Sequence, residues 1–176
     1  MCIRDSYYAR ELFYHARYQE AIAEFTEFLD SKQGWIENCI DACKLLSYCY
    51  ASLGDRENQL RVLLRSMEYD LPRAELCCEI GRYFMEFSRY KEAVFWYETA
   101  VSREKNEKSG AFIQPDCYDY IPYLQLCVCW DRMGDHEKAA SYNELAGAIK
   151  PNSEAVAYNR NYFQSLFSTA EEMREE

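Results

Sequence analysis

The sequence is poor in the residues that build tight turns. Its 176 residues include 6 glycines and 4 prolines, about half the usual share of these two residue types together. An all-β sandwich or barrel needs many Gly- and Pro-containing turns, so this composition argues against an all-β fold. Hydrophobic residues make up 49% and charged residues 28% of the chain, which excludes wholesale disorder and leaves enough apolar residues for a sizeable core.

Basic residues are also in short supply. The 20 Lys and Arg residues face 30 Asp and Glu residues, for a formal net charge of -10. This charge argues against a nucleic-acid backbone or an anionic membrane surface as the main partner. No apolar run approaches the roughly 20 residues that cross a bilayer, and the start MCIRDSYYAR lacks the apolar core of a signal peptide. We therefore expect a cytoplasmic protein with no nucleic-acid and no membrane partner.

Motifs for catalysis are missing as well. The sequence has no P-loop, GxGxxG or GxSxG pattern. Neither His15 nor His136 has a nucleophile and an orienting acid close by in the sequence, as nucleophilic catalysis requires. Asp116 and Asp119 flank Cys117 and could contact a ligand, although solvated loop carboxylates are the simpler interpretation. We expect no catalytic residue, no metal and no cofactor, so that this chain alone is not an enzyme.

What the sequence does contain is an internal repeat. Four segments each combine an apolar helix, a tight turn and a second apolar helix, and their turns align as ARYQEA, GDRENQ, SRYKEA and GDHEKA. The equivalent residues Ala21, Gln59, Ala93 and Ala139 are separated by 38, 34 and 46 positions. A period of 34 residues with two helices per unit is typical of tetratricopeptide repeats.

Positions inside the repeats resemble the tetratricopeptide family too. That family has a small residue where the paired helices cross and a large residue three positions later, because two helices approach closely only at a small side chain. The small positions hold Ala9, Ser47, Gly81 and Cys127, and the large positions hold Leu12, Tyr50, Phe84 and Trp130. In the second helices Phe25 and Tyr97 fit the pattern. Phe28 and Asn143 depart from it, and Tyr142 is a candidate to replace Asn143 in the packing.

The resemblance implies an all-α fold: a right-handed α-solenoid of about four helix-turn-helix repeats with a C-terminal capping helix. We expect one domain over residues 1–176. The expected parts are repeats over about 7–30, 40–70, 73–103 and 118–150, an insertion loop over 104–117 and the capping helix over 153–168.

The nine cysteines fit this repeat better than they fit a disulfide framework. Their odd number and the missing signal peptide favour reduced thiols. Cys43 and Cys77 occupy equivalent repeat positions, as do Cys49 and Cys129, which indicates packing in a core. No CxxC pair occurs, and Cys39 with Cys43 has no matching second pair, so no zinc site is expected.

In this family the first helices of the repeats line a concave groove, which implies a protein or peptide partner there. The candidate groove residues are Arg10, Phe13, Tyr14, Lys44, Tyr48, Glu75, Arg82 and Met85. The three cations among them suit an acidic group of a peptide. The alternative is that they pair with Asp41, Glu75 and Glu86 on neighbouring helices. The aromatic rings could likewise stack on a ligand or serve packing alone.

Several strings resemble a narrower family. RAELCCEIG and YIPYLQLCVCWDR, in a resemblance that runs from Ser6 to Phe163, are similar to the C-terminal tetratricopeptide region of bacterial family 2 glycosyltransferases. The resemblance implies a parent enzyme whose N-terminal α/β domain transfers a sugar from a nucleotide donor. The chain has no Asp-x-Asp metal motif, so no catalytic residue carries over to it. We expect a detached accessory domain, for which Met1 is not the natural start.

Three functions remain as alternatives. The leading one is a protein-interaction or acceptor-docking module, the non-catalytic region of such a glycosyltransferase, which binds a peptide, its own N-terminal catalytic domain or a second copy. The first alternative is glycosyl transfer by the full-length parent. The second is a freestanding adaptor or dimerisation module, in which the apolar face of the uncapped first helix pair self-associates.

Overall fold

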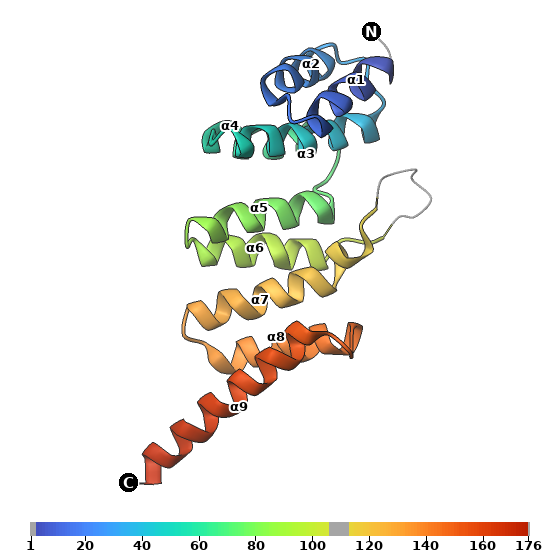
Figure 1. Cartoon of the computed structure of the whole chain (residues 1–176). Helices are drawn as coiled ribbons and strands as arrows, with labels where there is room; N and C mark the ends of the chain where they lie inside the picture. The colour runs from blue at the N-terminus through green and yellow to red at the C-terminus, as the bar shows by residue number, and fades with distance from the viewer. Residues whose placement is uncertain (1–2, 106–112, 176) are drawn as a thin grey trace. The chain divides into compact units, whose positions relative to one another are not determined.

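The computed structural model describes residues 3–105 and 113–175, and all regular structure in these ranges is helical (Figure 1). The α-helices are α1 (Ile3–Tyr14), α2 (Tyr18–Asp30), α3 (Ile36–Ser52), α4 (Arg56–Arg65), α5 (Ala74–Glu86), α6 (Tyr90–Val101), α7 (Tyr120–Arg132), α8 (His136–Ile149) and α9 (Glu154–Glu175). Two short 3-10 helices, η1 (Ser66–Glu68) and η2 (Pro115–Tyr118), stand between them. The composition argument against β structure is therefore consistent with the part of the chain that is described.

The chain divides into two compact units. The first unit comprises residues 1–76 and 106–113, and the second comprises residues 77–105 and 114–176. In the first unit α2 packs against both α1 and α3, and α3 packs against α4. Its core combines Ala9, Leu12, Ala21, Phe25, Phe28, Leu29, Cys43, Leu46 and Cys49. The single domain expected over residues 1–176 stays a prediction.

In the second unit, successive helices also pack side by side (Figure 1). Contacts run from α6 to α7, from α7 to α8 and from α8 to α9. Cys127, Ala139 and Phe163 form a buried cluster that joins α7, α8 and α9, and Trp130 and Tyr142 pack on its edge. The helix over 153–168 that the sequence indicates corresponds to α9, which continues to Glu175.

One turn geometry recurs in the four helix hairpins. The residue two positions after the end of each first helix has a positive φ. These residues are Ala16 at 56°, Gly54 at 75°, Ser88 at 56° and Gly134 at 86°. The next backbone N–H reaches back to the carbonyl five residues earlier, as in a Schellman motif. These hydrogen bonds are Arg17 to Leu12, Asp55 to Tyr50, Arg89 to Phe84 and Asp135 to Trp130, at 2.9 to 3.0 Å. The four acceptors are the large residues of the repeat pattern, so the register predicted from the sequence is the register of the turns.

The second helices start in two different ways. In the two Gly-Asp turns, the carboxylates of Asp55 and Asp135 accept the backbone N–H of Asn58 and Lys138, at 3.1 and 3.0 Å. These bonds satisfy donors at the helix start that otherwise lack a partner. In the other two turns an arginine stands at the capping position and pairs instead with a glutamate three residues later, as Arg89 does with Glu92.

The small residues of the repeat pattern lie where paired helices touch. Ala9, Ser47, Gly81 and Cys127 are all buried. At Gly81 on α5, an added Cβ would stand 2.8 to 3.0 Å from three carbon atoms of the Tyr97 ring on α6. The Tyr97 ring is itself fully buried and has no room to retreat. Glycine at position 81 is therefore what permits this helix contact.

The two departures from the repeat pattern have different physical reasons. Phe28 is buried, and an added Cβ at Gly34 would stand 2.6 Å from its ring. Glycine at position 34 has no side chain, and this leaves the room that the Phe28 ring occupies. Asn143 is also buried, but it serves hydrogen bonding: its amide donates to the Val156 carbonyl at 3.1 Å and its oxygen accepts from Asn159 at 3.0 Å. Asn143 fixes α9 on α8.

The segment over 104–117, expected to be an insertion loop, is described only in part. Residues 106–112 lie outside the described ranges, and the segment ends in η2, where Pro115 occupies the first helical turn. Lys105 and Asp119, one on each side of the insertion, form an ion pair at 2.9 Å. Over residues 3–105 and 113–175, no helix combines the length and the apolar character needed to cross a membrane.

We expect Gly81→Ala to destabilise the chain. The steric conflict with Tyr97 costs about 1–3 kcal/mol, which outweighs the gain of up to about 1 kcal/mol in helix propensity. Urea unfolding followed by circular dichroism measures the change. In a Tyr97→Leu background the ring is gone, so Gly81→Ala should become neutral or stabilising there. A Gly81→Ala variant that is more stable than the wild type would contradict the proposed contact.

Candidate peptide-binding surface

Five of the predicted groove residues come together on α1 and α3 of the first unit. On α1 Phe13 and Tyr14 lie next to each other, with ring centroids 5.5 Å apart. The Phe13 ring is also 6.2 Å from the ring of Tyr48 on α3 and 6.2 Å from that of Tyr18 at the start of α2. Tyr14 is 65% exposed, whereas Phe13 and Tyr48 are half-buried. An aromatic cluster thus joins three helices and keeps one ring in solvent.

A charged trio adjoins these rings. Asp41 on α3 accepts from the Arg10 guanidinium of α1 at 2.5 Å and pairs with the Lys44 ammonium at 3.3 Å. The Asp41 side chain is only 12% exposed and that of Lys44 10% exposed. Charges so little exposed are stable only when paired. Arg10 and Lys44 therefore have the carboxylate partner that the alternative interpretation of the sequence expected, and the trio keeps one net positive charge.

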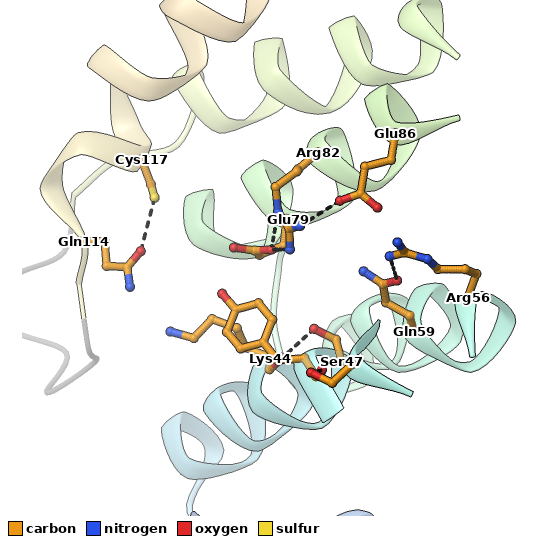
Figure 2. A network of polar contacts seen from close by, with 11 residues as sticks. Lys44, Ser47, Arg56, Gln59, Glu79, Arg82, Glu86, Gln114 and Cys117 are labelled. Atoms are coloured by element: carbon orange, nitrogen blue, oxygen red, sulfur yellow. Dashed lines mark hydrogen bonds and ion pairs between the residues drawn. The ribbon is translucent and has the colours of Figure 1, made fainter. Parts of the chain in front are cut away.

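The other three predicted groove residues lie elsewhere. Glu75 is buried in the first turn of α5. Arg82 and Met85 belong to the second unit, where Arg82 is exposed and Met85 half-buried. Figure 2 shows Arg82 between Glu79 and Glu86 of the same helix, with the Glu86 carboxylate 2.8 Å away. A groove shared by all eight residues stays a prediction.

Sequence reasoning missed three polar contacts of Arg73 and Arg56. Arg73 binds both Glu37 at 2.7 Å and Asp70 at 2.8 Å, and Arg56 donates to the buried Gln59 at 2.8 Å (Figure 2). The Glu37 and Gln59 side chains are buried polar groups, and Gln59 stands where the other three repeats have alanine. That mismatch in the sequence was the available signal.

The thiols buried in the helix core at Cys43, Cys49 and Cys129 are poor nucleophiles. Burial raises the pKa of Cys43 and Cys129 to about 12 and that of Cys49 to about 11. At neutral pH these groups stay protonated, and the thiolate is the form that attacks or binds a metal. In the described part of the chain, no three His, Cys, Asp or Glu side chains are placed to hold a metal ion.

The remaining titratable candidates have structural partners. His136 lies with Nδ1 2.8 Å from the Asp131 carboxylate. Asp116 pairs with Lys150, and Asp119 pairs with Lys105. Desolvation alone would raise the pKa of the Asp119 carboxyl. Hydrogen bonds from the Lys105 ammonium and the Tyr120 backbone N–H outweigh this effect, so the pKa of Asp119 is lowered. These groups join neighbouring segments, as ion pairs in helical proteins commonly do.

A pocket of about 530 Å³ opens between the α7–α8 turn and α9. It is lined by Met133, Gly134, Asp135, His136, Glu137, Leu166 and Phe167. The Asp135 carboxylate in its wall is occupied as the cap of α8. The pocket is apolar toward α9 and polar toward the turn, so it suits a side chain better than a reacting substrate.

Comparison with known proteins agrees with the repeat pattern. Residues 74–107 match the tetratricopeptide repeat family. Three similar solved structures are of MamA. The first is 16% identical, with a TM-score of 0.65, and covers 100% of this chain and 99% of that one. The second is 17% identical, with a TM-score of 0.63, and covers 97% and 92%. The third, segment 41-end from Desulfovibrio magneticus RS-1, is 13% identical, with a TM-score of 0.63, and covers 94% and 96%.

Among curated proteins, none matches the sequence significantly. Likeness to solved structures at such low identity concerns the fold alone. The comparisons confirm the predicted all-α fold class. They do not show a relation to glycosyltransferases.

We expect Asp41→Asn to destabilise the chain by about 1–3 kcal/mol. The substitution keeps the side-chain shape but removes the carboxylate charge that pairs with Arg10 and Lys44 at low exposure. The free energy of unfolding in urea measures the loss. Glu57→Gln is the matched control, because Glu57 pairs with Arg61 in open solvent and such pairs contribute little. Equal losses in both variants would contradict the role assigned to Asp41.

The equivalent turns of the helix pairs and the small residues at the helix crossings agree with the family match and with the structural matches. The chain contains a tetratricopeptide repeat at residues 74–107 and has the helical-repeat fold of tetratricopeptide proteins.

Proposed function

We propose that this chain is a protein-interaction module and that an extended peptide binds across α1 and α3 of the first unit. The observation that carries the proposal is the exposed aromatic cluster beside the Arg10–Asp41–Lys44 trio. Solvent-exposed tyrosines give a large contact area at low entropic cost and keep a hydroxyl for hydrogen bonding. Tyr7, which is also exposed on α1 and lies under the Arg10 guanidinium at 5.6 Å, extends this area along the helix.

The chemistry of the surface favours a peptide that combines an apolar and an acidic side chain. The apolar side chain would contact Phe13 and Tyr14. The acidic side chain would approach the trio, in which two cations accompany one carboxylate. The overall charge of -10 would repel a strongly acidic partner, so one acidic group rather than a run is expected. This chain by itself would carry out no reaction.

We expect Tyr14→Ala to weaken binding of such a peptide about tenfold or more. A buried aromatic anchor contributes at least 1–2 kcal/mol at a typical interface, and tenfold corresponds to 1.4 kcal/mol. The whole chain selects ligands from a library of short random peptides displayed on phage. Fluorescence anisotropy then gives Kd for the selected peptides with the wild type and the variants.

Tyr158→Ala is the matched control for this experiment. Tyr158 is 74% exposed, on α9 in the second unit, and lies outside the proposed surface. The control should bind the selected peptides as the wild type does. Selected peptides that keep their affinity for Tyr14→Ala and lose it for Tyr158→Ala would overturn the proposal. A chain that selects no peptide would overturn it as well.

A second candidate concerns the parent polypeptide. We propose that this chain is the C-terminal region of a bacterial family 2 glycosyltransferase, which the strings RAELCCEIG and YIPYLQLCVCWDR support. The DNA upstream of the Met1 codon is expected to continue the reading frame into an α/β domain with an Asp-x-Asp motif. Residues 1–176 alone should transfer no sugar from a nucleotide donor. A stop codon directly upstream would remove the glycosyltransferase relation and leave a freestanding adaptor.

A further inference from the structure

Two buried thiols from different segments meet inside the second unit. The Cys78 thiol on α5 donates to the backbone carbonyl of Cys117 on η2, with 3.5 Å between sulfur and oxygen. The Cys117 side chain is near enough to be the first cause of the raised pKa of Cys78. Both residues are buried, Cys78 at 7% and Cys117 at 4% exposure. Because the Cys78 sulfur already contacts the backbone of Cys117, a local movement of η2 can bring the two sulfur atoms to disulfide geometry.

This pair differs from the other cysteines that the structure describes. Cys43, Cys49 and Cys129 fill core positions of the repeats. Cys39 lies four residues from Cys43 on the same helix, so a bond between them would close no long loop. Cys78 and Cys117 instead join an α-helix to a segment 39 positions later, on the far side of the insertion.

The short η2 helix gives one of the two thiols a route to a reagent. η2 has four residues, and its Cys117 N–H donates to the Gln114 carbonyl at 2.9 Å. The Cys117 thiol also donates to the Gln114 side-chain oxygen at 3.5 Å (Figure 2). Short 3-10 segments have poor hydrogen-bond geometry, so they open locally at low free-energy cost. Cys78, inside the 13-residue helix α5, has no comparable freedom.

We propose that Cys78 and Cys117 form a reversible intrachain disulfide, with a low-molecular-weight disulfide such as oxidised glutathione as the oxidant. Cys117, deprotonated during local opening of η2, attacks one sulfur of the oxidant and releases one glutathione thiolate, which takes up a proton. The Cys78 thiol then loses its proton and attacks the Cys117 sulfur of the mixed disulfide, releasing a second glutathione. The two protein thiols are oxidised by two electrons, and one oxidised glutathione is reduced to two thiols.

The neighbouring Cys117 side chain and burial act on the rate of this exchange. Both raise the pKa of Cys78 well above the ordinary range, so the thiolate that completes the second step is scarce at neutral pH. The disulfide therefore forms slowly and faster as the pH rises. Once formed, it closes a long loop that contains α6 and the insertion, and loop closure stabilises the folded chain.

The test is thiol mapping of the whole reduced chain after incubation with oxidised glutathione. Remaining thiols are blocked with N-ethylmaleimide, the chain is digested, and cross-linked peptides are identified by mass spectrometry. We expect one cross-link, between Cys78 and Cys117, and the loss of two of the nine thiols. The unfolding midpoint should rise by about 5–10 °C and return to its starting value with dithiothreitol.

Cys77→Ala and Cys78→Ala are a matched pair of variants, because both residues are buried in the same turn of α5. Cys77→Ala should keep the cross-link and the rise in midpoint, and Cys78→Ala should lose both. A cross-link that survives in Cys78→Ala overturns the proposal. So do glutathione adducts without a cross-link, or nine retained thiols under conditions that oxidise the urea-unfolded chain. Should either variant fail to fold, the wild-type cross-link map decides.

Discussion

The whole fold depends on how closely the two helices of each hairpin can approach. Each pair has a small residue at the crossing, and at Gly81 an added Cβ would stand 2.8 Å from a carbon atom of the Tyr97 ring. Interiors are packed too densely to absorb such an atom. The large residues that follow, such as Phe84, then fill the space beside the crossing and also accept the hydrogen bond that ends the helix. Packing and turn geometry are therefore set by the same few positions.

This shared constraint explains how much of the fold the sequence predicts. Turns, helix order and the buried small residues follow from a local pattern that recurs four times, and the structure has them where the pattern indicates. Asn143 could not be predicted in the same way. Asn143 is tolerated in the core because it hydrogen-bonds to the Val156 carbonyl and to Asn159. Both partners lie outside the repeats. A polar residue in a core is interpretable only when its partners are known.

The candidate surface is predictable in position but not in its pairings. Helix periodicity places Arg10 on α1 and Lys44 and Tyr48 on α3, and the structure brings Arg10 and Lys44 to the same carboxylate. Periodicity cannot choose between Asp41 and another carboxylate for Arg10, because that choice depends on side-chain reach and burial. The contact between Cys78 and Cys117 is harder still. It spans an insertion whose length follows no repeat, so no spacing rule connects its two ends.

Ion pairing need not compete with binding at the α1–α3 surface. A side chain that is free in solution loses rotamer entropy when a ligand fixes it, and this loss weakens the complex. Asp41 already holds Arg10 and Lys44 at low exposure, so that much of this entropy is lost during folding. The trio therefore presents its net positive charge in a fixed place next to Phe13 and Tyr14. A peptide would therefore meet a preorganised surface, in which the Asp41 carboxylate holds the two cations in place.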